Sequence, residues 1–509
     1  MPPRDASHSD ATVRMKSRPL IARPRPAWQR LFPTVIALGA AACVEVKVPG
    51  TATGGRGGIP EDGGISRPDV LTPDASPFIS TPDGGRACRN LQCQQMACPG
   101  GGDTTLTGTV YAPNGTLPLY DALVYVPNAA VPAFPAGLAC DRCGALPAGE
   151  PLVAALTDAH GQFTLQRMPA GTDVPLVIQV GKWRRQVRIP SVAACQANTI
   201  ADRDLTRLPR NRQEGDLPRI AVTTGTCDNL LCLLPKLGLD PSEWGVAGDG
   251  KPLTFYRGYE KAALFGPEYE VHFDAHLAQM TGAPALWGNL AELSQYDMTM
   301  LSCECDEHLE NKGAPAYDAV NRYLGMGGRV FSSDFQYVWY KYSPDPVVRA
   351  TAVINPRASP LQSDGTQIAI DTSLSKGKAL ADWYAYLAPG TTYGRIEARD
   401  VFNNFSSVTP PAGQTWGSSV PSQSTTSSHP TFFSMNTPVG APAEQQCGRA
   451  VHVDAHIVDL RTLMLHEFPA DCGSSLSPGE MVMAFFLFDA TACVQNDMDP
   501  PVPPPIVIY

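Results

Sequence analysis

The stretch YDMTMLSCECDEHLENKGAPAYDAVNRYLGMGGRVFSSDF, residues 296–335, decides the fold. It predicts a buried strand from Met298 to Cys303, a helix from about Ala316 to Leu324 that ends at glycines, and a second strand from Arg329 to Ser333. Both strands are continuous apolar runs, which is typical of a parallel sheet with helices on both faces. The stretch therefore indicates a β-α-β unit.

Further elements extend this α/β domain over residues 215–497. Ile220–Thr224 is expected to be a strand, followed by a short helix that Asp228 caps and Pro235 limits to about two turns. Arg449–Val458 is expected to return to the same sheet. Helices are predicted at 286–293 and 374–387, whereas 391–446 is expected to be loop-rich.

A capping box predicts the last helix. Ser477-Pro478-Gly479-Glu480 combines a capping serine, a proline at the first helical position and a glutamate three residues after the cap. The run that follows, MVMAFFLFDA, is apolar on nearly every face. Such a helix is buried in the protein, and it is too short to cross a membrane.

The length, composition and net charge of the chain limit the number of domains and the kinds of partner. The chain has 509 residues, enough for two or three domains, and its 49 prolines and 45 glycines indicate long loops or linkers. A net charge of -10 without a basic cluster in the folded part argues against a nucleic-acid partner.

The N-terminus predicts export. Residues 1–43 combine a basic region, in which Met15 is an alternative start, with an apolar run from Leu31 to Ala42. Ala40-Ala41-Ala42-Cys43 resembles the lipobox of bacterial lipoproteins, with alanine where leucine is usual. That resemblance implies lipidation of Cys43 and attachment to a membrane. Ordinary signal cleavage is the alternative.

Residues 44–103 form a Gly/Pro-rich linker that ends in a cysteine cluster. Up to about residue 86 the linker lacks apolar periodicity, so it is expected to be a disordered tether. A Pro-rich tail, 498–509, follows the α/β domain.

Residues 104–205 contain short, partly alternating segments that suggest an antiparallel sandwich. The segments LTGTVYAPNG, DALVYVPN and TDAHGQFTLQRMPAG resemble the carboxypeptidase regulatory-like domain, a seven-stranded transthyretin-like β-sandwich without catalytic residues. The matching residues are Gly108, Val110, Ala122, Val124, Val126, Thr157, Asp158, Gly161, Phe163, Leu165, Pro169 and Gly171. An insertion, Ala129–Gly149, departs from the pattern.

The whole of residues 104–495 resembles a group of secreted bacterial lipoproteins that pair such a module with a class I glutamine amidotransferase-like domain. The segments that carry the resemblance are TGTCDNLLCLLPKLGL, YDMTMLSCECD, VNRYLGMGGRVFSSDF, CGRAVHVDAHI and LSPGEMVMAFFLFDATACV. It implies a flavodoxin-like open parallel sheet and no established activity.

Fourteen cysteines in clusters indicate an oxidising compartment and several disulfides. Lipidation of Cys43 would leave an odd number, so one thiol would be free or paired between chains. The disulfide candidates are Cys88, Cys93, Cys98, Cys140, Cys143, Cys195, Cys227, Cys232, Cys303, Cys305, Cys447, Cys472 and Cys493.

Cys303 and Cys305 are candidate nucleophiles. Catalytic amidotransferases place their cysteine on a Gly-x-Cys-x-Gly turn after a strand, and the equivalent turn here is Ser302-Cys303-Glu304-Cys305-Asp306. Both glycines are missing, and neighbouring cysteines in an exported protein are more often oxidised than ionised. Catalysis by either residue is therefore disfavoured.

Two H-x-D-A-H motifs, at 272–276 and 452–456, are candidate metal sites. Alternation along a strand would place His452, Asp454 and His456 on one face, where they could bind a divalent metal. The alternative is a histidine whose N–H is accepted by the aspartate. His272 and His276 are the weaker pair, because their segment could be helical without the glutamate of a zinc hydrolase.

Asp306, Glu307 and His308 follow the central strand, and Asp334 follows the next, so they would rim the ligand site expected beyond parallel strand ends. Ordinary solvated loop residues are the alternative. The aromatic residues Phe335, Tyr337, Trp339, Tyr340 and Tyr342 could stack on a sugar or peptide or belong to the core.

The sequence thus predicts an exported, lipid-anchored envelope or surface protein that binds a glycan or a protein, or has a structural role, and needs no cofactor. The competing hypothesis is a metal- or carboxylate-assisted hydrolase of envelope polymers, which would use His452, Asp454 and His456 with Asp306 or His308.

Overall fold

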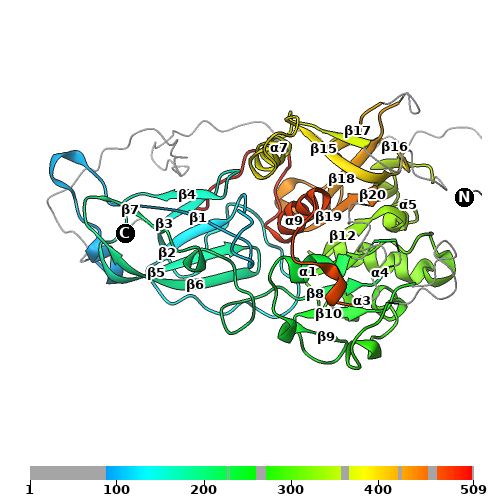
Figure 1. The fold of residues 1–509 in the computed structure, drawn as a ribbon, viewed down its shortest axis with the longest axis horizontal. Coiled ribbons are helices and arrows are strands. Elements are labelled where there is room, and N and C mark those ends of the chain that lie inside the picture. Colours follow the sequence, from blue (N-terminus) through cyan, green and yellow to red (C-terminus); the bar gives the residue numbers. More distant parts are fainter. Residues whose placement is uncertain are drawn as a thin grey trace, which may run out of the picture. The chain divides into compact units, whose positions relative to one another are not determined.

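The computed structural model describes residues 88–506, apart from 226, 229, 260–270, 357–365, 422–426 and 457–466. The predicted signal segment, Cys43 and the predicted tether lie outside these residues. The chain combines two sheets of a sandwich with a large mixed sheet, helices and a two-stranded ribbon (Figure 1).

Seven strands form the N-terminal sandwich. One sheet has the order β4-β1-β7 and the other β3-β2-β5-β6. All pairs are antiparallel except β1 with β7, so the expectation of a purely antiparallel sandwich was wrong at that edge. The strands are β1 (Thr105–Thr109), β2 (Leu123–Pro127), β3 (Pro151–Leu156), β4 (Gln162–Leu165), β5 (Gly171–Val180), β6 (Trp183–Val192) and β7 (Ala197–Thr199).

The turn before β4 forms as its sequence predicts. Gly161 has a φ of 74°, in the left-handed region that favours glycine. The Asp158 carboxylate accepts the backbone N–H groups of His160 and Gln162, at 2.8 and 2.9 Å. Phe163 and Leu165 then both point into the sandwich core, where they are buried.

The predicted parallel sheet makes up six strands of the large sheet. In the order β19-β12-β11-β8-β10-β9, every neighbouring pair is parallel. The central strands are buried along their whole length. The bounds are β8 (Ile220–Thr223), β9 (Trp244–Val246), β10 (Leu253–Tyr256), β11 (Met298–Leu301), β12 (Arg329–Ser333) and β19 (Gly448–Val453).

Antiparallel strands extend that sheet and correct the expectation that 391–446 is loop-rich. From β19 the order continues β18-β17-β14-β15-β20, and β20 follows β19 in the chain with only Asp454 between them. This row of antiparallel strands therefore begins at β19 and ends at β20, the next strand in the chain. Figure 1 shows both strands beside α9. Their bounds are β14 (Thr366–Ile370), β15 (Arg395–Val401), β17 (Gln414–Ser419), β18 (Pro430–Thr437) and β20 (Ala455–His456), and β13 (Ala352–Ile354) pairs with β16 (Phe405–Val408).

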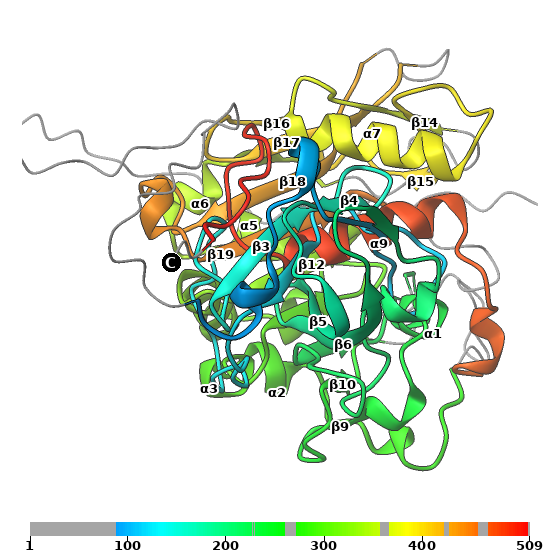
Figure 2. The same ribbon diagram turned by 90° about the vertical axis from the view of Figure 1, so that its left-hand side faces the viewer.

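The helix α9 (Pro478–Thr491) begins at the predicted capping box: Ser477 Oγ accepts the Glu480 N–H, and Glu480 Oε2 accepts the Ser477 N–H. It is buried on all sides because it lies between the sandwich and the large sheet (Figures 1 and 2). Phe488 contacts Trp183 of β6, and Phe486 contacts Trp416 of β17, with ring centroids 5.7 and 5.2 Å apart. Within the described ranges, no helix has the length and apolarity that a membrane span requires.

The other predicted helices differ mainly in their ends. The helices α4 (Ala314–Gly325) and α7 (Ser375–Leu387) match their predictions closely. The helix expected at 286–293 is divided into α2 (Pro284–Trp287) and α3 (Leu290–Leu293), because the Asn289 side chain accepts N–H groups of Ala291 and Glu292 and starts a new helix. The short helices are α1 (Leu233–Lys236), α5 (Val338–Lys341) and α6 (Pro346–Arg349).

Six disulfides among the described cysteines confirm the prediction of several disulfides from the cysteine content. They are Cys88–Cys93, Cys98–Cys195, Cys140–Cys447, Cys143–Cys493, Cys227–Cys305 and Cys232–Cys472. Two of them tie the Ala129–Gly149 insertion of the sandwich to the α/β part. The prediction that Cys303 joins a disulfide was wrong. Among the described cysteines it is the one with a free thiol, and its neighbour Cys305 is bonded to Cys227.

Candidate functional site

The candidate site lies where two parallel strands end and β20 runs beside them. Cys303 comes two residues after β11, Asp334 directly follows β12, and His456 ends β20. Carboxyl ends of parallel strands are the usual ligand-binding edge of an open sheet. The structure thus brings together residues from both of the separate sites that the sequence suggests.

Asp334 joins the other two side chains. The Cys303 thiol donates to Asp334 Oδ2 at 3.2 Å, and His456 Nε2 lies 3.0 Å from the same oxygen. The Cys303 backbone N–H donates to Ser333 Oγ, and the Cys305 N–H donates to Cys303 Sγ at 3.3 Å. Asp334 and Cys305 both have a left-handed backbone, with φ of 41° and 69°, a conformation that is costly for non-glycine residues.

A second carboxylate is connected to the first through Asn404. The Asn404 side-chain amide donates to Asp454 Oδ1 at 2.6 Å and to Asp334 Oδ1 at 3.1 Å, and its backbone N–H donates to Asp454 Oδ2. Burial, followed by the charge of Asp334, raises the pKa of Asp454 well above its usual range. No sequence pattern pointed to Asn404, which lies in the stretch expected to be loop-rich.

Asp228 completes the cluster from the end of β8. It is fully buried, and within the described part of the chain no hydrogen bond of normal geometry reaches either carboxylate oxygen. Burial raises its pKa to about 7, although His456 and the Ser333 hydroxyl favour the ionised form. The prediction that Asp228 caps a helix was therefore wrong: its carboxylate accepts no N–H group of the described helical turn, which begins at Leu230.

The Cys303 thiol is protonated at neutral pH in this arrangement. Its side chain has no exposed surface, and burial, with the Asp334 charge, raises its pKa to about 12. His456 opposes this shift and does not overcome it. A reactive cysteine needs an accessible thiolate, which this conformation does not offer.

The second H-x-D-A-H motif does not converge on one point. His452 Nδ1 lies 2.9 Å from Ser332 Oγ, whereas Asp454 turns to Asn404 and His456 to Asp334. The His452 ring packs on Phe405, with centroids 5.0 Å apart, and burial lowers its pKa to about 3. Asp454 interrupts the regular alternation, because it lies between β19 and β20.

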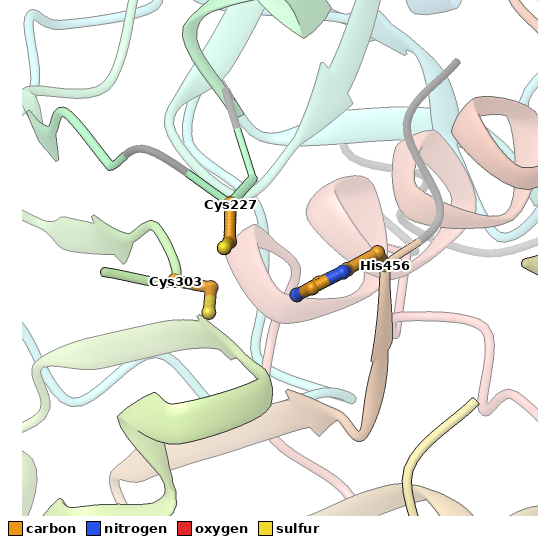
Figure 3. Close-up of side chains that lie close together, drawn as sticks. All are labelled: Cys227, Cys303 and His456. Atoms are coloured by element: carbon orange, nitrogen blue, oxygen red, sulfur yellow. The ribbon is translucent and has the colours of Figure 1, made fainter. Parts of the chain in front are cut away.

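A different trio has metal-ligand spacing. Ligand atoms of Cys227, Cys303 and His456 all lie within 4.8 Å of one another (Figure 3). Cys227 is bonded to Cys305 and cannot supply a thiolate in this oxidised form. The trio is therefore not a ready metal site, and its chemistry is that of a thiol beside a disulfide.

Of the predicted rim residues, Asp334 belongs to the cluster, whereas Asp306, His308 and the first H-x-D-A-H motif do not join it in the described part of the chain. His276 Nε2 is 2.8 Å from Asp249 Oδ2, and Asp274 accepts the His276 N–H. Asp306 is exposed, and His308 stacks on Tyr259 with centroids 3.8 Å apart.

Glu304, between the two cysteines, is a buried polar residue that the sequence did not single out. It forms an ion pair with Lys312, which is also buried. Glu304 therefore has a structural role beside the cluster.

The aromatic residues after β12 belong mostly to the core, since Tyr337, Trp339 and Tyr340 are buried.

A separate aromatic surface lies between the sandwich and α7. We call it the tyrosine hollow, an open depression of about 570 Å³. Tyr386 and Tyr393 are both 52 % exposed, the Tyr386 ring stacks on His160 at 4.6 Å, and Tyr393 donates to Asp382 at 2.7 Å. The lining residues are Asp158, Ala159, His160, Asp382, Ala385, Tyr386 and Tyr393.

No protein-family model matches this chain, and no curated protein matches it. Among solved structures, a ThuA-like protein from Bacteroides uniformis aligns with 49 % of this chain and 88 % of its own, at 7 % identity and a TM-score of 0.28. A cohesin-X-dockerin complex from Acetivibrio cellulolyticus aligns with 29 % of this chain and 79 % of its own, at 16 % identity and a TM-score of 0.14.

Proposed function

We propose that this protein is an exported envelope or surface protein, anchored through a lipid on Cys43, that binds a glycan at the tyrosine hollow. The six disulfides support export, because such bonds persist in oxidising compartments. The basic N-terminal region, the apolar run and the small residues before Cys43 support the anchor.

The half-exposed pair Tyr386 and Tyr393 carries the binding proposal. Tyrosine rings offer an apolar face to the C–H surface of a sugar and a hydroxyl group at the edge. The carboxylates of Asp158 and Asp382 line the same hollow and can accept hydrogen bonds from sugar hydroxyls. The hollow is open, as a site for a polymer requires.

The state of Cys303 supports binding over amidotransferase catalysis. Its thiol is fully buried, donates to Asp334 and is protonated at neutral pH. Neither glycine of the amidotransferase turn is present around it.

Binding to isolated cell-wall polysaccharide, measured by sedimentation of the purified exported chain, tests the proposal. We expect the double substitution Tyr386→Ala and Tyr393→Ala to weaken binding at least tenfold. Met326→Ala is the matched control, since Met326 is 51 % exposed at the end of α4, away from the hollow lining. Equal binding by the double variant and the unchanged chain would refute the glycan site.

The anchor needs its own experiment. Metabolic labelling with a radiolabelled fatty acid should mark the unchanged protein and leave Cys43→Ser unlabelled. Label that persists in Cys43→Ser would rule out lipidation at this residue.

A hydrolase acting on envelope polymers is the second candidate. The contact of Cys303 and His456 with Asp334 at the sheet edge favours it. Release of soluble fragments from cell-wall material that is lost in both Cys303→Ser and His456→Ala would establish catalysis. Absence of release, with a thiol that stays unreactive in the folded protein, would exclude it.

A further inference from the structure

A free thiol lies beside a disulfide in the candidate site. Cys303 Sγ and Cys227 Sγ are within 4.8 Å of each other, and Cys227 is bonded to Cys305. In Figure 3 the sulfur atom of Cys227 points toward Cys303, and the His456 ring extends toward both cysteines. The Cys305 N–H donates to Cys303 Sγ, so the free thiol lies next to both members of the Cys227–Cys305 disulfide.

We propose that Cys303 and the Cys227–Cys305 disulfide form a thiol–disulfide exchange site. The Cys303 thiolate attacks Cys227 Sγ, a Cys303–Cys227 bond forms, and the Cys227–Cys305 bond breaks. Cys305 leaves with the electron pair as a thiolate. One disulfide is exchanged for another, so no external oxidant or reductant is consumed.

The polar residues around Cys303 can accept the proton that its thiol loses. Asp334 accepts the Cys303 thiol hydrogen, and His456 shares the same carboxylate oxygen. Asp228 is the third titratable group that faces this centre. The proton that leaves Cys303 passes to these groups and is available to the departing Cys305 sulfur. Because the buried thiol resists ionisation, exchange is slow at neutral pH and accelerates as the pH rises.

The exchange moves the free thiol from the buried Cys303 to the more accessible Cys305. Cys303 has no exposed surface, whereas Cys305 is half-buried in the loop that also carries the exposed Asp306. A Cys305 thiolate can therefore attack a disulfide of a small molecule or protein, forming a mixed disulfide and releasing the partner's second thiol. The ligand class that this site takes is a disulfide.

Disulfide mapping by mass spectrometry after slow alkylation of the folded protein with iodoacetamide is the test. We expect alkylation to accumulate on Cys305 rather than Cys303, together with a Cys227–Cys303 linkage, and to proceed faster at pH 9 than at pH 7. Alkylation confined to Cys303, or no alkylation of either residue at pH 9, would overturn the proposal.

Two variants sharpen the test, and the first does not depend on reagent access. Cys305→Ser should carry a Cys227–Cys303 disulfide as purified, whereas free thiols at both positions would contradict exchange. In Cys303→Ser, Cys305 should stay in its disulfide and resist alkylation at pH 9. Cys88–Cys93 is the internal control for general disulfide scrambling, because it should remain intact throughout.

His456 is a positioning residue in this scheme. His456→Gln should slow Cys305 alkylation and change its pH profile, while the other five disulfides stay as they are. An unchanged pH profile would remove His456 from the exchange site.

Discussion

A Cβ atom on Gly225 would lie 2.3 Å from the backbone carbonyl oxygen of Cys303. The end of β8 therefore passes against the segment that holds the thiol, with no room for a side chain between them. Gly225 Cα also stands close to the Ser302 side chain, since the same Cβ would be 2.9 Å from its Cβ atom.

Gly225→Ala should lower the free energy of unfolding by about 1–3 kcal/mol, the usual cost of overpacking a core. It should also expose Cys303, because the backbone carbonyl has to move away. Urea unfolding and thiol labelling measure the two effects. Gly325→Ala is the control, since outside its own helix no atom lies within 4 Å of its Cβ position. It should leave Cys303 buried and should not destabilise the protein, because alanine favours the helix. A neutral Gly225→Ala would contradict the close approach.

Asp228→Asn should stabilise the protein at pH 8. The folded-state pKa of Asp228 is raised from the ordinary 3.8 to about 7, so the folded protein holds this proton more tightly than the unfolded chain does. This contribution to stability is greatest below pH 4, falls between pH 4 and pH 7, and totals on the order of 4 kcal/mol. The free energy of unfolding, measured at pH 5 and pH 8, should fall less between these pH values in the variant than in the unchanged protein. Equal decreases would contradict the raised pKa of Asp228.

His452→Asn should have the opposite effect on pH dependence. Burial lowers the pKa of His452 from 6.5 to about 3, so the unfolded chain binds the proton more tightly. Stability from this residue is complete above pH 6.5 and is lost as the pH falls toward 3, by at most on the order of 5 kcal/mol. Asparagine does not titrate and can keep a polar group near Ser332. The free energy of unfolding, measured by urea titration, should therefore fall less between pH 6.5 and pH 4 in the variant than in the unchanged protein. An equal decrease would show that His452 is not held in its neutral form by burial.

Removal of the Cys143–Cys493 disulfide by serine substitution at both positions should reduce stability by about 2–5 kcal/mol. This bond links residues 350 positions apart, whereas Cys88–Cys93 spans five. Because a longer loop restricts the unfolded chain more, the Cys88→Ser and Cys93→Ser pair should cost less. Thermal unfolding of both double variants makes the comparison, and equal costs would show that loop length does not decide the effect.

Local patterns were enough to predict the elements that form from neighbouring residues. The Ser477 and Glu480 capping box placed the start of α9, and the apolar runs placed β11 and β12 within one or two residues. The strands β15 and β17 were missed, because sequences such as QTWGSS have few apolar residues and gain their stability from antiparallel partners.

The site could be predicted only in pieces. The sequence placed Cys303 and Asp334 after neighbouring strands, but the contact of Asp334 with His456 joins residues 122 positions apart. That contact depends on β20 pairing with β15, which brings the chain back toward the parallel strands. Alternation along 452–456 suggested one face for all three motif residues, and the interruption at Asp454 separates them.

The two bonds from the Ala129–Gly149 insertion have a consequence for assembly and for attack by proteases. Cys140 and Cys143 can pair only after residues 447 and 493 have been synthesised, so these links form late. Once they exist, a single cut between the sandwich and the α/β part would not release either half. Fragments would separate on a denaturing gel only after reduction, and the nicked protein would stay in one piece.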